Sequence, residues 1–128
     1  EGVMAMGRYL KAKHLLGILY DQDTNDSRIR TDLFGKKLFT PAGPAVFSRV
    51  FGCPVLPVFL HYDPDGSCRV KFYPPLYASK TKDKEKDLYQ VTKQLMLILE
   101  QEIRSNPPMW FWVHDRWKYE REQFEQTM

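Results

Sequence analysis

The chain has 128 residues, a length that suits one compact domain and is too short for two of ordinary size. Hydrophobic residues make up 43% of it, which is enough for a core. Nineteen Lys and Arg against sixteen Asp and Glu leave a net charge of +3, a mild excess that identifies no polyanionic partner. The apolar runs at residues 15–20 and 95–99 are far shorter than the roughly 20 residues of a membrane span. Two cysteines, Cys53 and Cys68, are too few for a disulfide framework and are expected to be small core residues.

The N-terminal third predicts a helix, a strand and a loop. Apolar side chains recur at helical spacing between Val3 and Lys13, which predicts an amphipathic helix. The apolar run from Leu15 to Tyr20 then predicts a buried strand. From Asp21 to Phe39 the sequence begins with short polar side chains that compete for backbone hydrogen bonds, so a long loop is expected at the C-terminal end of that strand.

The middle of the chain predicts a short helix and a hairpin. Thr40 and Pro41 are typical of a helix start, and Gly52 is typical of a helix end about three turns later. The apolar residues 53–60 predict a strand, made irregular by two prolines, which pairs through an Asp-Pro-Asp-Gly turn with the alternating residues 68–73. A four-residue loop at 63–66 would place Cys68 opposite His61.

A second, longer helix is expected from Asp87 to Ser105, because its apolar residues fall on one face and two prolines, Pro107 and Pro108, follow it. The predicted order is therefore helix, strand, helix, hairpin, helix. This order indicates a single α/β domain in which helices pack on a small mixed sheet.

Polar residues after the first predicted strand are the first candidate site. Asp21, Gln22 and Asp23 lie where an open α/β sheet usually places its ligand contacts, and their side chains suit sugar hydroxyls or the orientation of a base. The alternative is that these aspartates cap the next element. Asp32 is open to the same two interpretations.

The three histidines offer no recognisable catalytic pattern. His14, His61 and His114 have neither metal-ligand spacing nor a Ser, Cys or second His in triad order. The sequence alone therefore indicates no nucleophile and no metal site.

Two cationic clusters complete the candidates. Residues 110–119 interleave large aromatic side chains with cations, which suits phosphate, nucleic acid or a membrane interface, or else an aromatic plug that closes the domain. Arg28, Lys36 and Lys37, with Arg30 nearby, are suited to hold a phosphate, or else belong to a solvated loop.

Taken in order, the motifs resemble the C-terminal part of the lipid A biosynthesis acyltransferases, the lauroyl and myristoyl transferase type within the lysophospholipid acyltransferase-like group. Each motif is weak alone, but their order and spacing along nearly the whole chain are specific. The matching residues are Asp21-Gln22-Asp23, Asp32-Leu33-Phe34-Gly35, Thr40 to Ala45, Phe51 to Pro57, Pro74-Pro75, Ile103-Arg104 and Pro107 to Lys118.

The resemblance implies the C-terminal part of a glycerolipid acyltransferase-like α/β fold. It also implies transfer of a fatty acyl group from an acyl carrier protein thioester to a hydroxyl of a lipid A precursor or related glycolipid, at the cytoplasmic face of the inner membrane. No cofactor or metal is implied, because a His and carboxylate pair drives such a transfer by general base catalysis. No nucleic-acid partner is implied either.

Specific residues inherit roles from the resemblance. Asp21, Gln22 and Asp23 are expected to face the acceptor or to shape the cleft, and Asp32 is expected to assist from the loop. Residues 40–43 are expected to aim a helix N-terminus at the same cleft. Arg28, Lys36 and Lys37 are candidates for lipid phosphate or the acidic carrier protein, while His114, Arg116 and Lys118 are expected to support the site.

The catalytic motif of the family is absent from this sequence. The resemblance implies a His followed after four residues by Asp or Glu, but the corresponding positions after His14, His61 and His114 are Leu19, Gly66 and Tyr119. The motif and the membrane-attached segment are therefore expected N-terminal to the matched region, and this chain alone is expected to be inactive.

Three other interpretations fit the same residues. The first is an enzyme that acylates a different glycolipid or a lysophospholipid, the second is a non-catalytic lipid-binding or structural module, and the third is a binder of single-stranded nucleic acid.

Overall fold

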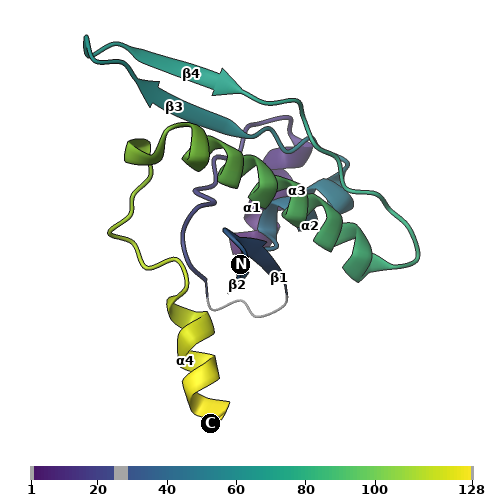
Figure 1. Cartoon of the computed structure of the whole chain (residues 1–128). Helices are drawn as coiled ribbons and strands as arrows, with labels where there is room; N and C mark the ends of the chain where they lie inside the picture. The colour runs from purple at the N-terminus through teal and green to yellow at the C-terminus, as the bar shows by residue number, and fades with distance from the viewer. Residues whose placement is uncertain (1, 25–28, 128) are drawn as a thin grey trace.

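The computed structural model describes residues 2–24 and 29–127, and its elements are arranged around one long central helix (Figure 1). In chain order the elements are α1 (Gly2–Lys11), β1 (Arg30–Leu33), β2 (Lys36–Phe39), α2 (Gly43–Phe51), β3 (Val58–Tyr62), β4 (Cys68–Phe72), α3 (Lys84–Ser105), the 3₁₀ turn η1 (Pro107–Met109) and α4 (Lys118–Thr127).

Helix α3 carries the core because its apolar side chains form one continuous stripe. Asp83 starts the helix by accepting a hydrogen bond from Lys86 N, which satisfies one of the free amides of the first turn. The N-terminal half of the stripe packs against Ile29, Ala42 and Ala45, and the C-terminal half packs against β1, β2 and Trp110. The buried members of the stripe are Leu88, Val91, Leu95, Met96, Leu99 and Ile103.

Residues 30–39 form an antiparallel hairpin, so the prediction of a continuous loop from Asp21 to Phe39 was wrong. Strand β1 pairs with β2 from Arg30 opposite Phe39 to Leu33 opposite Lys36. Phe34 and Gly35 turn the chain with φ values of 53° and 75°, and two positive φ values are what a tight turn with the twist of a hairpin requires. The hairpin forms because Leu33 and Leu38 are fully buried against α3.

The strand predicted for Leu15–Tyr20 is absent, and this segment is irregular. The side chain of Leu15 is 98% exposed and that of Leu19 is 77% exposed. A strand needs a neighbour to receive its backbone hydrogen bonds, and no described segment pairs with this one. The apolar run has the composition of a strand, but no neighbouring strand is present to pair with it among the described residues.

The hairpin of β3 and β4 is confirmed, with a register that differs by one residue from the prediction. Tyr62 lies opposite Cys68 and His61 lies opposite Arg69, because Asp63 N donates to Ser67 O and the loop spans five residues. One face of the hairpin packs on α3 and the other, which includes Cys68, faces outward. The expectation that both cysteines are core residues was therefore wrong, since Cys68 is exposed and Cys53 is half-buried.

Helices α1, α2 and α3 are confirmed close to their predicted positions, and α4 was not predicted. Helix α2 ends at Gly52, whose φ of 68° lets its N–H bond to Ser48 O. Figure 1 shows α4 extending from the end of the molecule opposite the β3–β4 hairpin. The α/β class is confirmed, and the described strands form two separate two-stranded antiparallel sheets. No helix among the described residues is long and apolar enough to span a bilayer.

Candidate functional site

The carboxylate of Asp23 joins the loop after residue 20 to the C-terminal segment. Arg116 Nη1 lies 3.3 Å from Asp23 Oδ1, and Tyr119 N donates to Asp23 Oδ2 at 3.2 Å. The side chains of Arg116 and Asp23 are 0% and 5% exposed. This is a buried ion pair, in which each charge partly offsets the hydration that the other loses on folding.

His114 contacts the same loop through its ring. Asp23 N donates to His114 Nε2 at 2.7 Å, so Nε2 is the acceptor nitrogen and the imidazole proton is placed on Nδ1. An Nε2 lone pair that already accepts a backbone hydrogen bond is not available to take a proton from a substrate hydroxyl. His114 therefore braces the loop in this structure.

Arg116 also connects this cluster to the end of β2. Its Nη1 donates to Phe39 O at 2.9 Å, while Nε and Nη2 have no hydrogen-bond partner among the described residues. Burial lowers the pKa of Arg116, Asp23 opposes that shift, and the guanidinium remains protonated. Burial also disfavours the charged form of the neighbouring Tyr20 and so raises the pKa of its hydroxyl, while Thr92 and Arg116 act to lower that pKa. One side chain thus ties three segments together.

Thr40 lies directly beyond this junction. Its hydroxyl is fully buried and is 2.7 Å from the hydroxyl of Thr31, and its N–H donates to Ile29 O. Helix α2 begins shortly afterwards at Gly43, and its N-cap residue, Ala42, provides no side-chain hydrogen bond. Gly43 is half-buried and has open space where a Cβ would lie. Thr40 therefore positions the start of α2. There Pro44 and Ala45 are buried, while the space beside Gly43 is open.

Three other predicted site residues lie at the opposite end of the β1–β2 hairpin. Asp32, Lys36 and Lys37 surround its turn, and Lys37 Nζ is 3.0 Å from the Asp32 carboxylate in an exposed pair. At about 3.3 Å per strand residue, Lys36 is roughly 13 Å along the strand from Thr40. The structure thus separates these charges from the cluster around Asp23.

The remaining candidates have more open surroundings. Asp21 is half-buried and Gln22 is exposed, both directly beside Asp23 in the chain. Lys118 is exposed and its Nζ is 3.9 Å from Glu122. Arg28 lies outside the described residues.

A second polar cluster was not predicted. Glu102, whose side chain is 4% exposed, lies on the inner face of α3 and accepts hydrogen bonds from Lys71 Nζ, at 2.5 Å, and from the Tyr73 hydroxyl. His61 Nε2 is 2.9 Å from the other carboxylate oxygen. Burial tends to raise the pKa of Glu102, but the bonds from Lys71 and Tyr73 outweigh it, so the pKa lies below its usual value.

The sequence did contain a signal for this cluster. Glu102 falls between Leu99 and Ile103 in the apolar stripe of α3, and a carboxylate at such a position requires a buried partner. Lys71 and Tyr73 alternate along the second hairpin strand, so they share one face. Because the pairing depends on tertiary packing, the partners themselves were not evident.

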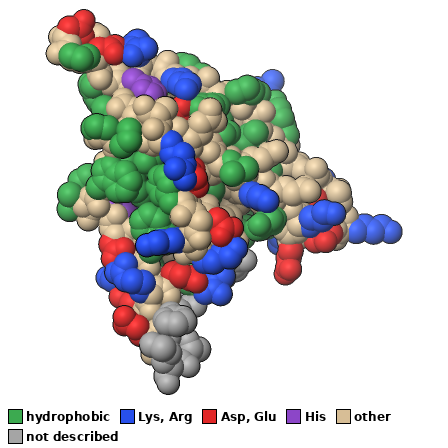
Figure 2. All heavy atoms as spheres, in the orientation of Figure 1, with side chains coloured by type: hydrophobic (Ala, Val, Ile, Leu, Met, Phe, Trp, Pro, Cys, Tyr) green, Lys and Arg blue, Asp and Glu red, His purple; other side chains and the backbone are tan. Residues whose placement is uncertain are grey.

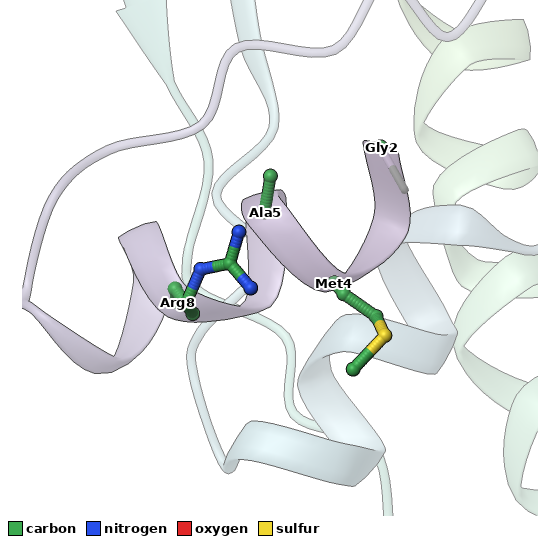
Figure 3. Close-up of a pocket in the computed structure, with 4 residues that line it drawn as sticks. All are labelled: Gly2, Met4, Ala5 and Arg8. Atoms are coloured by element: carbon green, nitrogen blue, oxygen red, sulfur yellow. The ribbon is translucent and has the colours of Figure 1, made fainter.

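A hollow on the surface of α1 has a different residue composition from these two polar clusters. Gly2, Met4, Ala5 and Arg8 line it, and all four belong to the same helix (Figure 3). It presents neither a carboxylate nor an imidazole for proton transfer. The clusters around Asp23 and Glu102 therefore remain the better candidates for a functional or positioning role.

A comparison with protein families decides what these residues belong to. Residues 2–119 match the family described as bacterial lipid A biosynthesis acyltransferase. The chain belongs to this family. The match covers nearly all of this acyltransferase-family chain, including Asp23 and Arg116, and confirms the resemblance drawn from the motifs. No curated protein matches the sequence.

Within this lipid A biosynthesis acyltransferase family member, the histidines have partners other than the expected catalytic carboxylate. No histidine in the sequence is followed after four residues by Asp or Glu. His114 accepts a bond from Asp23 N, and His61 lies against Glu102. The described residues thus supply a braced loop and a helix N-terminus, without the His-carboxylate motif that the resemblance implies.

Proposed function

We propose that the protein takes part in moving a fatty acyl group from an acyl carrier protein thioester to a hydroxyl of a lipid A precursor or related glycolipid. The observation that carries this proposal is the family match over residues 2–119. Membership of an acyltransferase family supports a transfer reaction with an acyl donor and a lipid acceptor. The carrier protein, the glycolipid and the cytoplasmic face of the inner membrane as the place of reaction are our proposals.

Within the transfer, residues 1–128 are proposed to form the acceptor side of the cleft. Asp21 and Gln22 would contact acceptor hydroxyls, because they are the more open members of the Asp21-Gln22-Asp23 motif. Asp23 would hold that motif in place through Arg116, and Thr40 and Gly43 would set the start of α2 beside it. Lys36 and Asp32, with Arg28, are proposed to meet the charged groups of donor or acceptor.

We propose further that residues 1–128 do not turn over by themselves. General base catalysis needs a base within hydrogen-bond reach of the acceptor hydroxyl. None of the three histidines has the sequence motif for this role, and His114 Nε2 is already an acceptor for Asp23 N. The base would come from a His followed after four residues by Asp or Glu, N-terminal to the matched region.

The test is an acyl-transfer assay read by mass spectrometry. The chain alone, and the chain with whatever its reading frame encodes upstream, would be incubated with acyl carrier protein thioesters and a lipid A precursor. A product heavier by one acyl group is expected only with the extended protein. Product from a lysophospholipid but not from the precursor would replace the glycolipid acceptor with that lipid.

The alternative function is a non-catalytic lipid-binding or structural module. The absent His-carboxylate motif favours it specifically. It predicts that the extended protein binds the precursor and gives no product with any donor or acceptor. If the upstream reading frame encodes neither an apolar span nor the His motif, the non-catalytic module becomes the better-supported function.

A further inference from the structure

Three consecutive apolar residues protrude from the loop between η1 and α4. Phe111, Trp112 and Val113 are 66%, 55% and 87% exposed, although the residue before them, Trp110, is buried. Large apolar side chains next to one another on a surface are unusual unless the surface contacts something. We call Phe111–Val113 the aromatic tip.

The backbone of the aromatic tip is held in a defined shape. Trp112 N donates to Trp110 O at 2.9 Å and His114 N donates to Phe111 O at 3.1 Å, which makes a tight turn. The indole of Trp112 donates to Pro107 O at 2.7 Å. The exposed side chains are therefore presented by a fixed loop, which lowers the entropy cost of using them in a contact.

Contacts between aromatic rings, centred on the buried Trp110, anchor this loop to the domain. The ring of Trp110 meets Trp112 edge to face at 4.6 Å and Trp117 at 6.1 Å. Phe34, from the turn of the β1–β2 hairpin, stacks on Trp112 at 6.3 Å. The aromatic tip and the hairpin turn thus form one surface.

One cation contacts an aromatic ring of this surface, and two exposed lysines follow the residue of that ring in the chain. Arg104 packs its guanidinium 5.0 Å above the ring of Phe34, and Lys36 and Lys37 follow that residue on β2. Glu100 pairs with Arg104 and Asp32 pairs with Lys37, so the group keeps an excess of one positive charge. Figure 2 shows hydrophobic side chains gathered where the loop after α3 runs, with Lys and Arg side chains next to them.

We propose that the aromatic tip, with Lys36, Lys37 and Arg104, docks on the surface of an anionic phospholipid bilayer. Trp and Phe partition into the interface between head groups and acyl chains, and Lys and Arg beside them meet the lipid phosphates. A bilayer requires no matching groove, and the tip is a protrusion made of neighbouring residues. This contact would hold the domain at a lipid surface whether or not it catalyses acyl transfer.

The two macromolecular alternatives fit the surface less well. Single-stranded nucleic acid binds by stacking bases on open aromatic faces, whereas Phe34 already stacks on Trp112 and Trp110 meets that ring edge to face. An acidic carrier protein is recognised chiefly through cations, whereas the exposed side chains of the aromatic tip are all apolar. Val113, the most exposed side chain of the tip, serves neither partner.

The experiment measures binding of the whole chain to vesicles of phosphatidylcholine with and without phosphatidylglycerol. The double variant Phe111→Ser/Val113→Ser should bind at least about tenfold more weakly to both, because it loses inserted apolar area. The double variant Leu60→Ser/Val70→Ser removes exposed apolar side chains of the β3–β4 hairpin and should bind like the wild type. Removing Lys36 as Lys36→Gln should weaken binding to the anionic vesicles alone, by about fivefold.

Two readouts on the wild type make the result independent of variant folding. Tryptophan fluorescence should shift to shorter wavelength on binding, and lipids brominated in the upper acyl chain should quench it. Equal binding by Phe111→Ser/Val113→Ser, absence of quenching, or an equal loss in the hairpin control would overturn the proposal. So would competition of vesicle binding by an oligonucleotide or by acyl carrier protein at the same tip, which would make that macromolecule the partner.

Discussion

Arg116 lies 3.3 Å from the carboxylate of Asp23, although 93 positions separate the two residues in the chain. The pair is buried, and Arg116 also bonds to the carbonyl of Phe39 at the end of β2. The proposed acceptor loop therefore takes its position from the last part of the family match. Loss of the C-terminal segment would release this loop, because the contacts of the Asp23 carboxylate to Arg116 and to Tyr119 N come from there.

The first prediction concerns this pair. Arg116→Met leaves the Asp23 carboxylate buried without its counter-ion, so the free energy of unfolding should fall by about 3–5 kcal/mol. Asp23→Asn should also destabilise the protein, and the double variant should lose less than the sum. Urea unfolding of the four proteins, followed by circular dichroism, measures the coupling.

A matched control is available on the surface. Lys118 and Glu122 form an exposed pair with a long separation of 3.9 Å, so Lys118→Gln should change stability by less than about 1 kcal/mol. Strict additivity of the Arg116 and Asp23 variants would show that the two side chains do not stabilise each other.

The second prediction concerns the turn of the β1–β2 hairpin. Gly35 has a φ of 75° and no atom within 4 Å of the place where a Cβ would lie. Gly35→Ala should therefore destabilise through backbone strain alone, by about 1–2 kcal/mol. Gly43→Ala, which also meets no neighbour and has no positive φ, is the control and should be neutral or slightly stabilising. Thermal unfolding compares the two variants, and an equal effect would refute the strain argument.

The third prediction tests the proposed acceptor loop in an active, extended form of the protein. Gln22 is exposed beside the braced Asp23, so Gln22→Ala should raise KM for the acceptor by up to about tenfold, the effect of one lost hydrogen bond. The KM for the acyl donor should not change. Gln101→Ala, exposed on α3, is the control. An unchanged acceptor KM would remove Gln22 from the proposed site.

Local patterns predicted α1, α2, α3 and the existence of the second hairpin, but they missed α4 and placed the hairpin register one residue away. The stripe of α3 and the Gly52 end of α2 are written into consecutive residues, so their positions needed no knowledge of distant contacts. The family, too, followed from the order of short motifs. Asp23 and Arg116 were both selected from the sequence, but their pairing was not, because it depends on how segments far apart in the chain fold together.

The two wrong predictions of secondary structure both depend on contacts between segments that are distant in the chain. Leu15–Tyr20 has the composition of a buried strand, yet a strand forms only where another segment receives its hydrogen bonds. The β1–β2 hairpin was missed for the opposite reason, since Phe34-Gly35 is an unusual turn pair and Lys36 and Lys37 make the second strand look polar. Its stability comes from burying Leu33 and Leu38 against α3, which no local window contains.

The last prediction concerns acid stability through Glu102. Its pKa in the folded protein is lowered, because hydrogen bonds from Lys71 and Tyr73 outweigh the opposing effect of burial. The folded state therefore binds the Glu102 proton less readily than the unfolded state does. The stability that this group contributes is complete above the ordinary pKa of about 4.5, and it is lost as the pH falls through the lower folded value.

Glu102→Gln should consequently lower the unfolding temperature near neutral pH and flatten its decline between about pH 5 and 3. Removing the carboxylate also takes the charged acceptor away from Lys71 and from the Tyr73 hydroxyl, so lower stability is expected near neutral pH. Glu120→Gln, which breaks the ion pair with Arg30, is the carboxylate-to-amide control. Calorimetry across this pH range measures all three proteins. An acid profile of Glu102→Gln parallel to that of the wild type would show that another carboxylate governs acid unfolding.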